Sequence, residues 1–137
     1  MVIADLQQPS VLDFLAKPLL AKLVTLNRDG SPQITFMWHE MRDGQFYFST
    51  TKERLKFANV SRDPRAAVAI DDPQNMQRGV IARGVATITE EGAVDLVTRL
   101  AERYSGPEGA RRTRERALRE NRIIIRLEPK RVRIQGF

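Results

Sequence analysis

The chain has 137 residues and a formal net charge of +6, a size that suits one domain and a charge that favours an anionic partner. It contains no cysteine, which excludes disulfides, thiolate metal sites and cysteine nucleophiles, and its single histidine leaves no second imidazole for a zinc site. No signal peptide or uninterrupted apolar segment of membrane-spanning length is evident, so we expect a cytoplasmic protein that does not enter a membrane.

The first fifty residues predict one short helix followed by three strands. Ser10 is the expected N-cap of a helix that stops near Pro18. Strand-like runs follow at residues 20–26, 33–41 and 45–50, separated by the dipeptides Asp29-Gly30 and Asp43-Gly44. Because aspartate followed by glycine is typical of tight hairpin turns, we expect the three strands to pair in chain order as an antiparallel meander.

The rest of the chain alternates between helices and strands. We predict a helix, two strands, two helices separated at Ser105-Gly106-Pro107, and two final strands, at residues 52–61, 65–71, 78–89, 91–104, 108–120, 122–127 and 131–135. Gly79 and Gly84 in the longest strand indicate bulges or a close backbone approach. Because strands dominate and hairpins are short, residues 1–137 are predicted to form one mainly β domain, an antiparallel β-barrel with inserted helices.

Several catalytic motifs are absent from the sequence. Neither G-x-G-x-x-G nor G-x-x-x-x-G-K-[ST] occurs, so the usual dinucleotide and P-loop fingerprints do not apply. The nucleophile elbow G-x-S-x-G is also missing, which argues against hydrolase chemistry. His39 falls within a predicted strand, where we expect a satisfied or solvated ring in preference to a catalytic base. The residues by themselves therefore assign no catalytic group.

One segment combines hydroxyls with cations at the point where a strand is followed by a helix. Its hydroxyls are Ser49, Thr50 and Thr51, and its cations are Lys52, Arg54 and Lys56. The first turn of a helix offers unpaired N–H groups and a positive dipole end, which hydroxyl donors and an arginine fork complement. This pattern predicts a phosphate-binding cradle. The alternative is that a threonine only caps the helix while the cations lie on a solvated face.

A second candidate feature lies on the preceding strand, which carries Gln33 and the only tryptophan, Trp38. An aromatic side chain near an amide suits the face and edge of a flat heterocycle. The alternative is an aromatic side chain that packs in the core or at an interface. The pattern thus places a ring-binding stretch next to the predicted phosphate cradle.

Three stretches resemble a known family: D-G-S-P-Q-I-T, D-G-Q-F-Y-F-S-T-T-K-E-R-L-K-F-A-N-V and D-P-R-A-A-V-A-I-D-D-P. They are similar to the pyridoxamine 5′-phosphate oxidase-like split β-barrel superfamily, in the branch of flavin and deazaflavin oxidoreductases that use coenzyme F-420. The resemblance extends from Phe14 to Ile134. It implies an FMN-binding-protein-like split barrel, a homodimer with cofactor grooves at its interface, and hydride transfer to or from a small organic substrate. FMN is the alternative cofactor, and a non-catalytic flavin or deazaflavin carrier is the alternative function.

The same resemblance implies which residues bind the cofactor. The phosphate-binding segment of the family corresponds to Ser49, Thr50, Thr51, Lys52, Arg54 and Lys56. Gln33 and the strand after it, which includes Trp38, correspond to the stretch that lines the ring. Gln77 and Arg78 correspond to a region that the second subunit often contributes.

An arginine-rich run lies in the second of the two long predicted helices. Its members are Arg111, Arg112, Arg114, Arg116 and Arg119. The run suits the acidic polyglutamate tail of coenzyme F-420, although a solvated helix face is the commoner explanation of such a pattern. Nucleic-acid binding is not favoured, because surface aromatics do not accompany the run.

Overall fold

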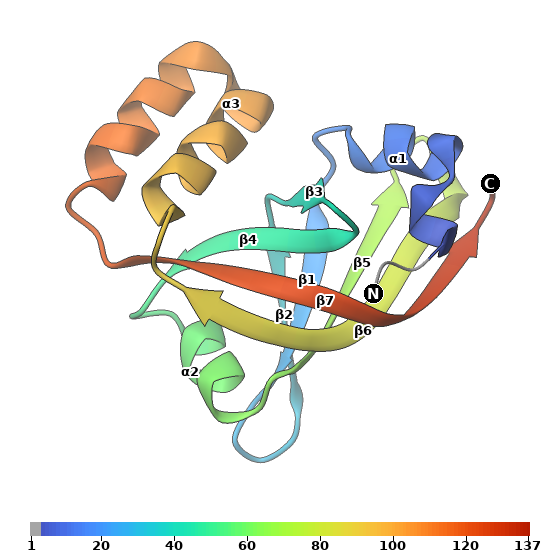
Figure 1. The fold of residues 1–137 in the computed structure, drawn as a ribbon, viewed down its shortest axis with the longest axis horizontal. Helices are drawn as coiled ribbons and strands as arrows, with labels where there is room; N and C mark the ends of the chain where they lie inside the picture. The colour runs from blue at the N-terminus through green and yellow to red at the C-terminus, as the bar shows by residue number, and fades with distance from the viewer. Residues whose placement is uncertain (1–3) are drawn as a thin grey trace.

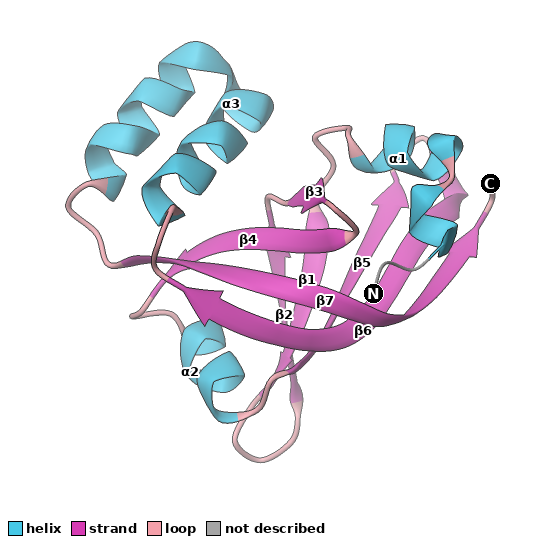
Figure 2. Cartoon of the chain, in the orientation of Figure 1, coloured by secondary structure: helices cyan, strands magenta, loops and turns pink. Residues whose placement is uncertain are grey.

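The computed structural model describes residues 4–137, which form a single seven-stranded sheet with helices outside it (Figures 1 and 2). The strands are β1 (Ala21–Leu26), β2 (Pro32–Met37), β3 (Glu40–Arg42), β4 (Gln45–Thr51), β5 (Arg65–Asp72), β6 (Asn75–Thr89) and β7 (Arg122–Gln135). Their order is β2-β1-β5-β6-β7-β4-β3, and every paired strand is antiparallel. The sheet curves into a half-barrel, which confirms the predicted mainly β, split-barrel fold.

Helices occupy the predicted regions but differ at their ends. They are the 3-10 helix η1 (Ala4–Gln7) and the α-helices α1 (Pro9–Leu15), α2 (Leu55–Arg62) and α3 (Ala93–Ala117). The N-cap of α1 is Gln8, so the prediction of Ser10 was wrong; proline suits the first helical position because its missing N–H has no partner there. Gly106, at φ 82°, divides α3 at the predicted break into two arms that lie side by side (Figure 2).

The predicted three-stranded meander is wrong, because β2 and β3 lie at opposite edges of the sheet. The predicted strand 33–41 stops at Met37, and Trp38 and His39 leave the sheet. The N–H of His39 donates to the hydroxyl of Tyr104 at 3.2 Å, and its carbonyl accepts from the guanidinium of Arg103. These α3 side chains satisfy the backbone that a neighbouring strand would otherwise pair with. The chain therefore crosses from one edge of the half-barrel to the other.

The concave side of the sheet holds the main core, and α3 packs against the outside. Alternation along β7 turns Ile123, Ile125 and Leu127 into the barrel and Ile124 outward. Ile124 contacts a second apolar cluster on α3, which also includes Ala93, Leu96 and Leu100. This cluster holds the first arm of α3, residues 93–105, against the outer face of β7.

The backbones of β6 and β7 approach closely at Gly84, as predicted for a glycine within this strand. A Cβ on Gly84 would lie 1.9 Å from the carbonyl oxygen of Glu128, and the strand register shifts between Arg83 and Gly84. The two predicted final strands are one strand, β7, with Pro129 opposite Gly84. Proline is tolerated there because β7 pairs with β4 only as far as Leu127, so the missing N–H faces no second neighbour.

Candidate functional site

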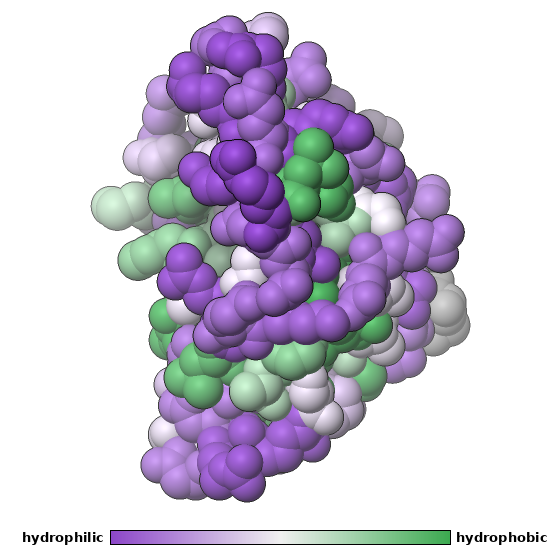
Figure 3. Space-filling model, turned by 90° about the vertical axis from the view of Figure 1, so that its left-hand side faces the viewer, coloured by the Kyte–Doolittle hydropathy of each residue, from purple (hydrophilic) through white to green (hydrophobic). Residues whose placement is uncertain are grey.

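A groove of about 540 Å³ opens between β2 and β4, the strands on either side of the barrel's split. We name it the β2–β4 groove. Its lining residues are Ile34, Thr35, Phe36, Met37, Ser49, Thr50, Thr51, Arg54, Lys56, Glu120 and Arg122. Figure 3, turned from the view of Figure 1, shows hydrophobic side chains exposed between hydrophilic ends of the molecule. The groove thus combines an apolar wall from β2 with hydroxyls and cations from β4, α2 and β7.

Two cations of the groove have no counter-ion within residues 4–137. The ammonium of Lys56 makes no hydrogen bond or ion pair there, although the residue is only 7% exposed. The guanidinium of Arg54 is likewise unpaired among the described residues, and Arg54 is the N-cap of α2 without a side-chain cap. Burial, followed by the charge of Arg54, lowers the pKa of Lys56. A cation on a largely buried residue without a counter-ion costs free energy that an anionic ligand in the groove would offset.

Arg122 is a groove residue that sequence reasoning did not find. It lies opposite Thr51 in the β4–β7 register, and its side chain is 15% exposed. Its guanidinium donates to the Ser49 hydroxyl at 3.3 Å and pairs with Glu120 at 3.1 Å. An arginine that begins a predicted strand carries no local signal for a site, because only the pairing of β4 with β7 brings it to Ser49.

Lys52 and Glu53 belong to the predicted segment but do not line the groove. Helix α2 begins at Leu55 instead of the predicted residue 52, so Lys52 and Glu53 lie in a turn. Lys52 forms an ion pair with Glu90, and Glu53 accepts a 2.6 Å hydrogen bond from Asn121. That bond is the main reason why the pKa of Glu53 is lowered. The structure therefore separates Lys52 from Arg54 and Lys56 and keeps Glu53 away from them.

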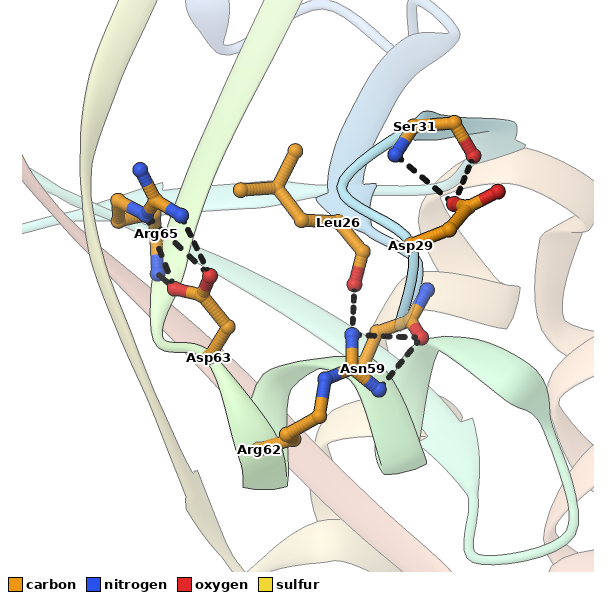
Figure 4. A network of polar contacts seen from close by, with 7 residues as sticks. All are labelled: Leu26, Asp29, Ser31, Asn59, Arg62, Asp63 and Arg65. Atoms are coloured by element: carbon orange, nitrogen blue, oxygen red, sulfur yellow. Dashed lines mark hydrogen bonds and ion pairs between the residues drawn. The ribbon is translucent and has the colours of Figure 1, made fainter.

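A polar network connects α2 to the β1–β2 hairpin (Figure 4). Asn59, which is fully buried, donates to Asn27 at 3.0 Å and to Gln33 at 3.3 Å. Arg62 donates to the Leu26 carbonyl and to the side-chain oxygen of Asn59. Gln33 was predicted to lie beside the ring of a cofactor. In the structure its side-chain oxygen accepts a hydrogen bond from Asn59 of α2. Gln33 is on the same face of β2 as Thr35, which lines the groove. The network thereby positions the start of α2, where Arg54 and Lys56 lie.

Trp38 lies at the far end of the groove from α2. Its indole stacks on the ring of Tyr104, with centroids 5.2 Å apart and planes 12° apart. The Tyr104 hydroxyl donates to the Leu19 carbonyl at 2.6 Å, which holds α3 against the strand. An adjoining cavity of about 260 Å³, the α3 pocket, begins here. It shares Phe36, Met37, Ser49 and Arg122 with the β2–β4 groove, and its other lining residues are Leu20, Trp38, Val97, Leu100, Thr113 and Arg116.

Comparison with known proteins identifies the family. The family model described as pyridoxamine 5′-phosphate oxidase matches residues 8–136. The chain belongs to this family. The match covers nearly all of the chain and confirms the resemblance that the sequence motifs indicated. No curated protein sequence is significantly similar to the chain.

Several solved structures share the fold of this chain. A structure described as an F-420 reductase is 27% identical over 88% of this chain and 94% of its own, with a TM-score of 0.74. Protein Rv2991 from Mycobacterium tuberculosis is 28% identical over 94% of this chain and 84% of its own, with a TM-score of 0.78. HutZ, a heme storage protein from Vibrio cholerae, shares the fold at 14% identity, covering 95% of each chain, with a TM-score of 0.72.

His39, the only histidine in the sequence, lies in the interior of the protein. His39 is fully buried, and neither ring nitrogen has a hydrogen-bond partner among residues 4–137. Burial, with a smaller contribution from the charge of Arg103, lowers its pKa to about 3. The expectation of a satisfied or solvated strand residue was therefore wrong. The neutral ring does not line the β2–β4 groove.

Gln77 and Arg78, predicted to bind the cofactor from a second subunit, do not meet the groove within one chain. They lie near the start of β6, at the opposite end of that strand from α3 (Figure 1). The Arg78 guanidinium lies over the rings of Phe137, at 4.3 Å, and Phe14, at 5.5 Å. Within the chain, Arg78 thus contacts the aromatic rings of α1 and the C-terminal segment.

No group of three or more His, Asp or Glu side chains in residues 4–137 is arranged to hold a metal ion. None of the helices in that range is long and apolar enough to cross a membrane.

Proposed function

We propose that this chain is an oxidoreductase that binds coenzyme F-420 and moves a hydride between the deazaflavin and a small organic substrate. One observation carries the proposal: Arg54 and Lys56 have no partner within residues 4–137, and they line the same groove as the hydroxyls of β4 and an apolar wall. A phosphate group near a flat ring presents the complementary chemistry. The similarity to an F-420 reductase supports the choice of coenzyme F-420.

The residues present fit both the phosphate and the ring of such a cofactor. Arg54, Lys56 and the hydroxyls of Thr50 and Thr51 would hold the phosphate, since each can donate a hydrogen bond to an anionic oxygen. Phe36 and its neighbours on β2 would provide the wall against which the ring lies, where they exclude water. The cofactor, when bound, supplies the hydride chemistry itself.

The chain's own contribution is therefore binding and orientation. Glu120 is the one carboxylate that lines the groove within residues 4–137, and Arg122 engages it at 3.1 Å. The buried His39 does not reach the groove. No residue is thus assigned as a general base, which agrees with a transfer that needs none. Positioning of the two reactants supplies the rate enhancement in this proposal.

FMN remains the alternative cofactor, since it also presents one phosphate and a flat tricyclic ring. A non-catalytic carrier of either cofactor would use the same groove. The test is titration of the purified protein with coenzyme F-420 and with FMN, in which binding is measured by calorimetry and by Trp38 fluorescence. Tighter binding of coenzyme F-420 supports the proposal, tighter binding of FMN overturns the cofactor assignment, and failure of both to bind overturns the function. Reoxidation of bound, reduced cofactor by a panel of electron-poor organic acceptors then separates an enzyme from a carrier.

The proposed active form is a homodimer. On β2, an edge strand, Ile34 and Phe36 are 62% and 71% exposed, and they lie beside the groove. Large apolar side chains with this exposure are typical of surfaces that a second protein covers. A second copy of the chain would cover them and supply a further wall of the groove. Sedimentation equilibrium at micromolar concentration is expected to show a dimer; a monomer would contradict this arrangement.

A further inference from the structure

The α3 pocket differs in character from the β2–β4 groove that it adjoins. Most of its wall is apolar or aromatic and comes from Leu20, Phe36, Trp38, Val97 and Leu100. Leu20 is 49% exposed and lies immediately before β1, whereas Leu100 is buried on α3. The stacked ring of Tyr104 holds Trp38 in place behind this wall. The pocket is therefore built to contact a flat apolar molecule.

Positive charge lies at one side of this apolar wall. Arg116 and Arg122 both line the pocket, and Glu120 is the only carboxylate in residues 4–137 with which either forms an ion pair. The Glu120 carboxylate is 3.1 Å from the Arg122 guanidinium but 3.9 Å from that of Arg116. Two guanidiniums thus share one carboxylate, which leaves one positive charge without compensation. An arginine fork of this kind suits a carboxylate, which it can bind through two parallel hydrogen bonds.

We infer that the α3 pocket is the acceptor-substrate subsite and that it takes an aromatic or similarly flat apolar carboxylate. The apolar part lies against Leu20, Trp38 and Leu100, while Arg116 binds the carboxylate and determines specificity for it. Because the pocket shares Phe36 and Ser49 with the groove, a ligand there lies next to a ring held along β2. This inference rests on the proposed function for the identity of the neighbouring cofactor.

The experiment uses a matched pair of rigid probes, 2-naphthoate and its neutral amide, 2-naphthamide. Calorimetry measures the binding of each to the full-length protein, with and without saturating coenzyme F-420. One charge-assisted hydrogen bond contributes enough to change affinity by about ten- to a hundredfold, so naphthoate is expected to bind that much more tightly than the amide. Both probes are expected to bind alongside the cofactor without competing with it.

Three variants separate the charge from the apolar wall. Arg116→Ala, whose parent side chain is 64% exposed, is expected to weaken naphthoate about ten- to a hundredfold and leave naphthamide unchanged. Leu20→Ser is expected to weaken both probes by a similar factor. Arg112→Ala is the control, because Arg112 lies on the same helix but does not line the pocket. It is expected to bind both probes as the wild type does.

The subsite is overturned if the wild type binds the two probes equally or binds neither. It is also overturned if Arg116→Ala keeps the wild-type preference for naphthoate over naphthamide. Competition between naphthoate and the cofactor assigns the pocket to the cofactor instead, which overturns the inference while the proposed function stands. If coenzyme F-420 and FMN both fail to bind while the probes behave as expected, the proposed function fails, and the pocket is an independent carboxylate site.

Discussion

Two basic regions of this chain differ in how their charges are used. In the arginine-rich run of α3, Arg111 pairs with Glu108 and Glu115, and Arg114 pairs with Asp95, all on the exposed surface. In the β2–β4 groove, Arg54 and Lys56 have no carboxylate partner within residues 4–137, and Lys56 is buried. Arg111 and Arg114 are thus paired with carboxylates, whereas Arg54 and Lys56 are not. Pairing and burial, more than the number of basic residues, therefore indicate where an anion binds.

The largest expected effect comes from removing the unpaired cations. Arg54→Ala and Lys56→Met are each expected to weaken binding of coenzyme F-420 by about ten- to a hundredfold, because each removes a charge-assisted hydrogen bond to phosphate. Calorimetry measures the affinities. The fold should persist, since Phe57 and Val60 still pack against the barrel core. Lys56→Met should also unfold at the same or a higher temperature, because it removes a buried charge that lacks a partner.

Added salt provides a control for this prediction. Screening acts on the charges that the variants lack, so raising the ionic strength should weaken binding to the wild type more than binding to Arg54→Ala. If both variants are folded and bind as tightly as the wild type, Arg54 and Lys56 belong to a solvated surface, as Arg111 and Arg114 do. The contrast between the two regions would then disappear.

A second effect concerns His39, a buried base that does not open into the groove. Its pKa is lowered to about 3 in the folded chain from an ordinary value of 6.5, so the unfolded chain takes up the proton first as pH falls. The neutral ring contributes to the free energy of unfolding above pH 6.5, and this contribution is lost as the pH falls from 6.5 to about 3. At about pH 4.5 the loss is about 2–3 kcal/mol.

His39→Leu tests this pH dependence. The variant should lose less stability than the wild type between neutral pH and about pH 4.5, as measured by urea unfolding at each pH. At neutral pH its stability should be similar to that of the wild type, because the ring nitrogens have no hydrogen bonds to lose. Parallel pH profiles of the two proteins would contradict the assignment of a buried, neutral ring.

A third effect should appear in the pH dependence of cofactor binding. Because burial and Arg54 lower the pKa of Lys56, its ammonium loses its proton at a lower pH than an exposed lysine does. Affinity for the phosphate group should therefore fall at a lower alkaline pH than it would with an exposed lysine. Lys56→Arg should keep its affinity over that range, since a guanidinium stays protonated. Titrations of both proteins at neutral and alkaline pH check this; an identical decline in both would show that another group is responsible.

The smallest effect is expected from a substitution in the arginine-rich run. Arg112→Ala removes an exposed ion pair with Glu108, whose atoms are 3.8 Å apart, and should change the free energy of unfolding by less than about 1 kcal/mol. Its affinity for FMN should equal that of the wild type. A marked loss of affinity for coenzyme F-420 alone would show that the acidic tail reaches this face, and would make the two regions parts of one site.

Local patterns in the sequence determined most of the elements and one half of the site. The Asp43-Gly44 turn has positive φ at both residues, which is what a two-residue hairpin turn requires. The hydroxyls and cations at residues 49–56 also indicated the groove, because a strand end followed by a helix start brings neighbours in sequence together in space. Strand boundaries near Trp38 and Pro129 were less predictable, since contacts with distant segments set them.

The tertiary structure alone decided which strands face each other and which charges are paired. The sheet order places β2 opposite β4, although the chain connects them through only a short strand, and the backbone of His39 is satisfied by α3, about sixty residues away. The pairing of β4 with β7 brings Arg122 to Ser49, which lies 73 residues away in the sequence. Sequence patterns extend over a few residues, whereas the energy of an ion pair depends on the distance and burial of groups that folding brings together.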